Sequence, residues 1–398
     1  MLRNRRFQNN IIVLLGLVGL VLTGCEGFFG KKVDASFIDV PIATDRPVAY
    51  VPIQPVWDNF TRPADIIIGY DELIYVVDDV TEEIIALDQA GNELGRFGVP
   101  GVHDIAMDRR LELLALGTFD TLGATLPAIY RIDLKSNGGA YGLSGASIVN
   151  KVLHPFYYKS SFTPGVDDLA DFTGIATRAD NSYYVSRSGP NVSQIFGPDD
   201  AMLIFGDDDD YATNVRVNTA GQVRGDYFIS PVAVVTKAQP PQSPFVNTEG
   251  DFIFASTDAT QQLKVRYIDV EETENGITYL VQEFAVGDTS AADGFLYTPG
   301  RFGSPTDVTF TGDGTNYIFV LDQEKDSLFQ FTNTGLEGVN PPAGSSSSKN
   351  IKVSFGGTGS SLTEFRQPTG VAYYRRIVYV ADAGNGRVLR FQLTTDFD

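Results

Sequence analysis

Cysteine and histidine are nearly absent from this chain of 398 residues, which has one cysteine, Cys25, and two histidines, His103 and His154. A single cysteine excludes any disulfide within one chain. Two histidines exclude a zinc site built from several histidines of the chain. A Gly-x-Ser-x-Gly motif, which would present a nucleophilic serine, is also missing, and the Ser-x-x-Lys match at residues 346–349 lies in a serine run typical of a surface loop.

Basic residues are scarce relative to acidic ones: 30 Lys and Arg stand against 50 Asp and Glu, giving a formal net charge of -20. Removing residues 1–24, which hold three arginines and no acid, changes -20 to -23. Nucleic acids and bare anionic lipid surfaces are therefore excluded as expected partners, because both require clustered positive charge. The acidic excess favours solubility or a saline habitat over a dedicated cation-binding role.

The first 24 residues have the layout of a cleavable export signal. Arg3, Arg5 and Arg6 precede an apolar run over residues 11–22, and small residues then lead to Cys25. A permanent membrane helix is the alternative, but the run falls short of the roughly 20 apolar residues that a span needs.

The tetrad Leu22-Thr23-Gly24-Cys25 resembles the lipobox of bacterial lipoproteins. This resemblance implies that Cys25 receives a lipid and becomes the first mature residue, with residues 25–46 as its tether. Acyl chains would then hold the protein at a membrane. Glu26 follows the cysteine, and the sorting rule of enteric lipoproteins then favours the outer membrane.

One phrase recurs six times after residue 60: a Pro or Gly, a short apolar strand, a turn, and further β-branched or aromatic strands. Six such units with almost no helical periodicity predict an all-β, six-bladed β-propeller over residues 47–398. Segments 138–147, 198–210, 239–247 and 341–349 are rich in turn residues and are predicted to be surface connections. Strong copies begin at Pro63, Pro305 and Phe365, and weaker ones at Gly101, Thr173 and Pro231.

The last unit has only three strands before the chain ends. We expect the apolar segment 48–53 to supply the fourth as an outer strand that closes the ring, since Pro52 and Pro55 suit an edge position. The Pro-Thr-Gly, Tyr-Val-Ala-Asp and Gly-Asn-Gly-Arg-Val elements within residues 365–391 resemble the NHL family of propeller repeats. This resemblance implies an NHL-like propeller, although the middle units match it only at the strand starts and in hydrophobic pattern.

Three aspartates, Asp65, Asp104 and Asp307, occupy the same place near the start of the predicted innermost strand. In a propeller this place surrounds one mouth of the central channel, where carboxylates could bind calcium, with His103 beside Asp104. The alternative is turn stabilisation, for which aspartate is an ordinary residue. A second set, Asp78, Asp322 and Asp382, follows the second strand and indicates turn capping. The run 207–210 is interpreted as a solvated loop, with loose calcium binding as the alternative.

These observations favour a non-enzymatic binding or scaffold propeller, anchored to the outer membrane through Cys25, that engages a protein or glycan partner in the cell envelope. Fold alone does not name that partner. The alternative is an enzyme resembling calcium-dependent lactonases or related hydrolases, with Ca²⁺ held by Asp65, Asp104 and Asp307. The sequence lacks the Glu and paired Asn expected at matching blade positions of such enzymes.

Overall fold

The computed structural model describes residues 47–397, apart from residues 122, 136–139, 154–169, 190–199, 220, 226, 239–249, 275 and 285. The predicted signal and tether, including Cys25, lie outside the described residues. So does His154, one of the two histidines of the chain. Among the described residues, no helix is both long and apolar enough to cross a membrane.

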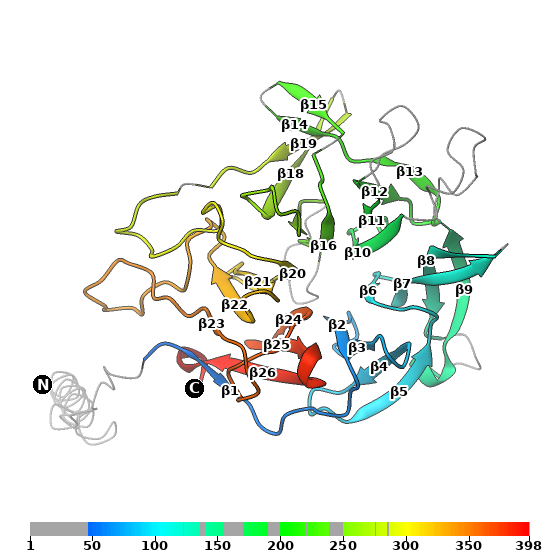
Figure 1. Cartoon of the computed structure of the whole chain (residues 1–398), viewed down its shortest axis with the longest axis horizontal. Helices are drawn as coiled ribbons and strands as arrows, with labels where there is room; N and C mark the ends of the chain where they lie inside the picture. The colour runs from blue at the N-terminus through cyan, green and yellow to red at the C-terminus, as the bar shows by residue number, and fades with distance from the viewer. Residues whose placement is uncertain are drawn as a thin grey trace, which may run out of the picture. The chain divides into compact units, whose positions relative to one another are not determined.

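Six sheets lie around a common centre, and each is one blade of a propeller (Figure 1). Neighbouring strands within the basic four-stranded units are antiparallel, as expected for short strands joined by tight turns. The predicted six-bladed, all-β propeller is confirmed. Blade one comprises β2 (Pro63–Ile68), β3 (Ile74–Asp78), β4 (Glu83–Leu87) and β5 (Glu93–Gly98). Blade two comprises β6 (Asp104–Met107), β7 (Glu112–Thr121), β8 (Ala124–Asp133) and β9 (Ser147–Leu153). Blade three comprises β10 (Asp171–Thr177), β11 (Tyr183–Ser188), β12 (Ala201–Phe205) and β13 (Tyr211–Asn214). Blade four comprises β16 (Pro231–Thr236), β17 (Phe252–Ser256), β18 (Val265–Thr273) and β19 (Gly276–Val281). Blade five comprises β20 (Pro305–Phe310), β21 (Ile318–Asp322), β22 (Ser327–Phe331) and β23 (Phe355–Gly356). Blade six comprises β24 (Gly370–Tyr374), β25 (Ile377–Asp382) and β26 (Arg387–Leu393).

The N-terminal strand β1 (Tyr50–Pro52) completes blade six. It pairs antiparallel with β26 and forms the outer edge of that sheet, with Val51 opposite Gln392. The predicted closure of the ring is therefore confirmed. The contact is longer than predicted, since Trp57 forms a further antiparallel bridge with Val388.

The hydrophobic core is divided among the six junctions between blades. Blades one and two, for example, enclose Tyr75 and Val77 together with Ile105 and Met107. Five further clusters fill the other junctions in the same way. Because neighbouring blades cover both faces of a central strand, β3 is buried along its whole length and reads as an apolar run instead of an alternation.

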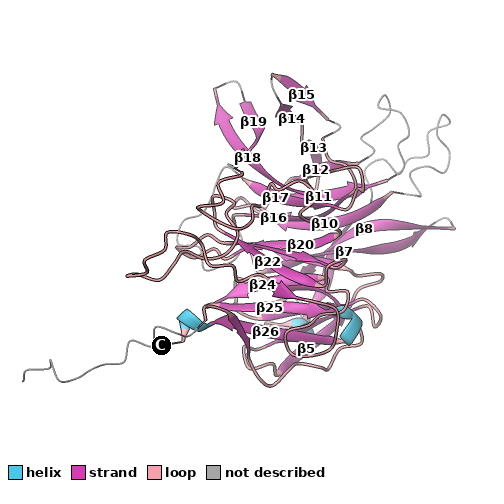
Figure 2. Ribbon diagram, turned by 60° about the vertical axis from the view of Figure 1, so that its left-hand side comes forward, coloured by secondary structure: helices cyan, strands magenta, loops and turns pink. Residues whose placement is uncertain are grey.

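Two features of the outer strands differ from the sequence prediction. The segment 198–210, predicted to be a surface connection, contains β12, which lies between β11 and β13. Blade four is a six-stranded sheet, because β14 (Val217–Thr219) and β15 (Gln222–Arg224) extend it beyond β19. Loop 341–349 has no regular structure, as predicted. Figure 2 shows how strongly strands dominate the described residues, where helical structure is limited to short 3-10 turns.

Deleting residues 48–53 is expected to lower the melting midpoint and broaden the unfolding transition. The deletion removes β1 and leaves the edge of β26 unpaired, so the two ends of the ring lose their main backbone contact. Thermal melts followed by circular dichroism check this. As a matched control, deleting six residues of the predicted tether, 36–41, should leave the midpoint unchanged. Equal midpoints for the two deletions would show that β1 does not hold the ring.

Candidate functional site

The three predicted channel aspartates lie where the sequence placed them. Asp65, Asp104 and Asp307 are on the innermost strands of blades one, two and five, and all three line one cavity at the centre of the propeller. This cavity has a volume of about 50 Å³, which admits a few water molecules. It is far below the roughly 300–1,000 Å³ of pockets for drug-sized ligands.

Each aspartate binds the innermost strand of the next blade. Asp65 accepts hydrogen bonds from its neighbour Ile66 N at 2.7 Å and from Ile105 N in blade two at 3.0 Å. Asp307 repeats this arrangement, accepting from Val308 N and from Val371 N in blade six, both at 2.7 Å.

Asp104 makes the same kind of link more weakly. Its Oδ1 accepts from Ile175 N in blade three at 3.3 Å, beyond the usual N–H···O range. In all three junctions a carboxylate thus links two neighbouring inner strands.

In four blades the residue just before the equivalent position of the inner strand makes a second kind of link to the next blade. Thr173 donates its hydroxyl to Pro231 O at 2.6 Å, Thr306 to Pro368 O at 3.0 Å and Thr369 to Pro63 O at 2.8 Å. His103 occupies the same place in blade two, and its Nε2 lies 2.7 Å from Phe172 O. The sequence analysis missed these links, although threonine precedes the key position in three units. We call the two sets of residues together the channel belt.

The remaining blades have small residues where the aspartates would stand. A Cβ at Gly370 would lie 3.0 Å from the Asp65 Cα, and one at Gly174 would lie 3.0 Å from the Ala233 Cα. The inner strands therefore approach each other most closely where no side chain separates them. Blade four has Val232 and Ala233 at the two belt positions, and its junction with blade five is an apolar cluster.

Tyr70 crosses the other end of the channel. It follows β2 in blade one, and its hydroxyl donates to Ala238 O, just after β16 in the opposite blade four, at 2.9 Å. Because this contact spans the ring, it narrows access to the cavity from that end.

The pKa values of all three channel aspartates are raised. Burial raises the pKa of Asp65 to about 6, although the amides of Ile105 and Ile66 act in the opposite direction. Burial and the charges of Asp65 and Asp307 raise the pKa of Asp104 well above its ordinary value. Burial and Asp65 do the same to the pKa of Asp307. These carboxyl groups thus favour protonation far more than exposed aspartates do.

The fit of this set to a calcium ion is poor as arranged. Both oxygens of Asp65 and of Asp307 already accept backbone N–H groups. In the part of the chain that the structure describes, no group of three His, Cys, Asp or Glu side chains is placed to hold a metal. The geometry of this set therefore matches hydrogen bonding between blades better than metal coordination.

The second aspartate set caps turns, as predicted. Asp78 accepts from Thr61 N at 2.6 Å and Asp322 from Gly303 N at 2.6 Å, and each also accepts from the amides of the turn that follows it. Asp382 accepts from Arg366 N at 2.7 Å and from the guanidinium of Arg387 at 2.7 Å.

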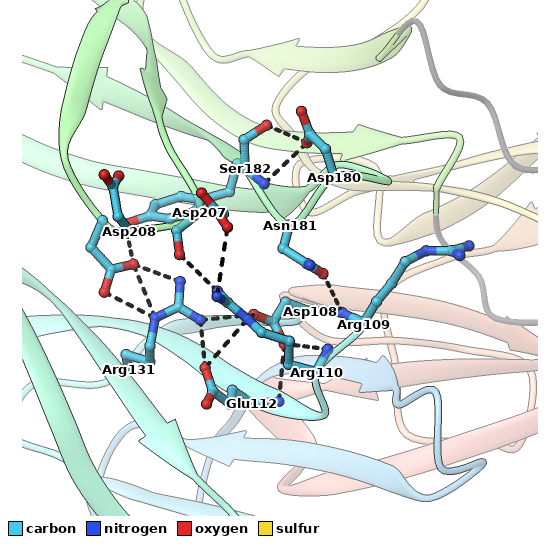
Figure 3. A network of polar contacts seen from close by, with 12 residues as sticks. Asp108, Arg109, Arg110, Glu112, Arg131, Asp180, Asn181, Ser182, Asp207 and Asp208 are labelled. Carbon is cyan, nitrogen blue, oxygen red and sulfur yellow. Dashed lines mark hydrogen bonds and ion pairs between the residues drawn. The ribbon is translucent and has the colours of Figure 1, made fainter.

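The acidic run 207–210 is exposed at Asp207, Asp208 and Asp210, as a solvated loop would be, but that interpretation is wrong for Asp209, which is buried. Asp209 is only 6% exposed and receives the guanidinium of Arg131. Arg131 comes from β8 in blade two and also binds Asp108 at 2.8 Å and Glu112 at 2.9 Å (Figure 3). Burial acts against ionisation, but hydrogen bonds from Arg131 and Asn150 hold the pKa of Asp209 below its ordinary value. This network joins blades two and three and is structural.

Comparison with known proteins finds likenesses in structure only. No family model matches the chain, and no curated protein matches its sequence. A gluconolactonase from Xanthomonas campestris aligns with 87% of this chain and 98% of its own, at 8% identity and a TM-score of 0.49. An auxiliary nutrient binding protein from Bacteroides thetaiotaomicron aligns with 84% of this chain and 69% of its own, at 12% identity and a TM-score of 0.49. Virginiamycin B lyase from Staphylococcus aureus aligns with 86% of this chain and 99% of its own, at 11% identity and a TM-score of 0.44. The fold assignment rests on the strand pairing of the chain itself.

An Asp65→Asn variant is expected to gain free energy of unfolding relative to the wild type as the pH rises. A carboxyl whose folded pKa is raised contributes stability that is complete below its unfolded pKa of 3.8 and is lost as the pH passes about 6. Asparagine does not titrate, so the difference between the two proteins should change in its favour by about 2 kcal/mol between pH 4 and pH 7. Urea unfolding at a series of pH values checks this. A difference that is constant with pH would contradict the raised pKa.

Proposed function

We propose that this protein is an outer-membrane lipoprotein whose propeller acts as a non-enzymatic binding or scaffold module for a protein or glycan partner of the cell envelope. The observation that carries the proposal is that residues of the channel belt form hydrogen bonds between neighbouring blades. The polar residues that could have formed a central catalytic site are bonded to neighbouring strands, around a cavity of only about 50 Å³. Binding is therefore expected on the outer surfaces of the propeller.

The lipid anchor enters the proposal through the sequence. The tetrad ending at Cys25 has the lipobox pattern, and no other cysteine is present to receive a lipid. The short stretch between Cys25 and β1 would act as a tether between membrane and propeller, with a fully extended length of about 80 Å.

Calcium-dependent hydrolysis at Asp65, Asp104 and Asp307 is the second candidate function. One observation favours it: three carboxylates line a single cavity, and no ion pair to a described Lys or Arg compensates their charge. Buried charges must be neutralised by protons or by a cation. The raised pKa values and the occupied oxygens favour protons.

Crosslinking of the full-length protein in native membranes should recover a partner together with the propeller. A Cys25→Ala variant should lose incorporation of labelled palmitate and should fail to reach the partner, because it cannot be lipidated. Mass spectrometry and glycan staining of the crosslinked bands provide the measurement. Recovery of monomer alone from wild-type membranes would count against a scaffold role.

Adding Ca²⁺ or removing it with a chelator should leave the melting midpoint of the detergent-solubilised full-length protein unchanged. Elemental analysis should likewise find no bound calcium, because the belt oxygens are occupied by amides. A rise in melting midpoint with Ca²⁺ that disappears in an Asp104→Asn variant would instead establish a channel cation site and support the hydrolase alternative.

A further inference from the structure

A second and larger cavity lies at the rim of the propeller, away from the channel. Its volume is about 220 Å³, roughly four times that of the channel cavity. One wall is the N-terminal segment 55–60, just after the closing strand β1, and the other is the hairpin formed by β4 and β5. We call it the rim pocket. Its volume would suit a ligand somewhat smaller than the drug-sized molecules that fill pockets of roughly 300 Å³ and above.

The inner part of the rim pocket is apolar and fixed in position. Trp57, the only tryptophan of the chain, is 6% exposed and packs beside Ile85 and Leu87. The guanidinium of Arg390 lies 4.4 Å from the centre of its ring, and the ring of Tyr379 lies 5.8 Å away. These contacts hold the indole in one orientation before any ligand arrives.

One donor in the pocket wall is unsatisfied. Trp57 Nε1 is buried and has no hydrogen-bond acceptor among the described residues, a condition that is unfavourable for a polar group. Glycine at position 91 allows the close approach of this donor to the hairpin, because a Cβ there would lie 2.1 Å from Nε1. The indole N–H is thus packed against Gly91 and is not open to the pocket.

The outer part of the rim pocket is polar and rich in acceptors. Asp58 and Asn59 are exposed, and neither side chain has a hydrogen-bond or ion-pair partner in the described part of the chain. On the other wall Arg96 is held between Glu83 and Glu93. Arg96 is the only Lys or Arg among the residues that line the pocket, and it is thus already neutralised, so an anionic ligand such as a phosphate or a carboxylate would meet net negative charge from the lining.

We infer that the rim pocket binds a neutral sugar unit of a glycan. A sugar ring presents an apolar face that suits Trp57, Ile85 and Leu87, and its hydroxyl groups both donate and accept. They can donate to Asp58 and exchange hydrogen bonds with the amides of Asn59 and Asn92. This inference rests on the proposed binding function and selects glycan over protein as the partner at this site.

Tryptophan fluorescence reports on the rim pocket directly, because Trp57 is the only tryptophan. Full-length protein in detergent is titrated with glucose, galactose, mannose, xylose and N-acetylglucosamine and with their disaccharides. Choline and inorganic phosphate serve as cationic and anionic probes. At least one neutral sugar is expected to produce a saturable change in emission, and phosphate is expected to produce none.

Two rim variants and one matched control locate the binding. Asp58→Ala and Asn59→Ala should each raise the half-saturation concentration about tenfold, because each removes one hydrogen-bonding group. Gln89→Ala changes an exposed residue of the same hairpin that does not line the pocket, and should behave like the wild type. All four proteins should share one melting midpoint, which confirms that the exposed substitutions leave the fold intact.

Three results would overturn the inference: no response to any sugar, a saturable response to choline alone, or sugar binding that is unchanged in both rim variants. None of these bears on the membrane crosslinking, so a partner recovered there would uphold the proposed function while the rim pocket was rejected. Conversely, sugar binding at Trp57 without any crosslinked partner would leave the pocket established and the scaffold role refuted.

Discussion

The pairing of β1 with β26 is the contact on which the whole ring depends, because it joins two ends of the chain that are separated by about 340 residues. No disulfide can reinforce it, since the chain has one cysteine. The closure extends well beyond the strand itself. Ile53 N donates to Arg390 O at 2.8 Å, and Val388 N donates to Trp57 O at 2.7 Å. The entropic cost of closing such a long loop grows only slowly with its length, so a modest number of well-made contacts can hold it.

The channel belt performs a related task at the centre. A propeller packs wedge-shaped blades, and the inner strands approach so closely that a Cβ at position 370 would lie only 3.0 Å from the Cα of Asp65. Each carboxylate or threonine hydroxyl at a junction satisfies a backbone group that the neighbouring blade turns toward the channel. The price is electrostatic, because burial raises the pKa of all three aspartates and the charge of Asp65 raises the pKa of Asp104 and Asp307 further. A structural role of this kind explains why acidic residues recur at one place in the repeat without forming a ligand set.

The fold could be predicted from the sequence because the pattern that defines one blade is repeated along the chain. Strand-forming runs bounded by turn residues recur six times, and the missing fourth strand of the last unit identified segment 48–53 as the closing strand. The strand β12 was missed for a local reason: the Pro, Asp and Gly residues around it dominate the composition of segment 198–210. Its apolar run is only five residues long, and burial between β11 and β13 fixes it as a strand.

The sequence predicted where the channel aspartates lie, but it did not predict that they form hydrogen bonds between blades. Equivalent places in a repeat predict that side chains gather around the channel, which the structure confirms for Asp65, Asp104 and Asp307. Whether their oxygens face an ion or a neighbouring amide depends on spacing between blades, which no single unit encodes. The bond between Arg131 and Asp209 spans 78 residues and two blades, and Trp57 meets Gly91 only once the ring is closed. Such contacts are products of tertiary packing and leave no local pattern.

One short segment takes part both in closing the ring and in the proposed binding of a ligand. Residues 55–60 follow β1 and form a wall of the rim pocket, and Trp57 belongs both to the closing contact with Val388 and to that wall. A ligand in the rim pocket would therefore contact the closed ring and find only half of its site if the segment were detached from β26. By mass action, a ligand that binds only the closed state stabilises that state, in proportion to the logarithm of its concentration above the dissociation constant. The segment nearest the proposed membrane anchor is thus also the place where binding would tighten the ring.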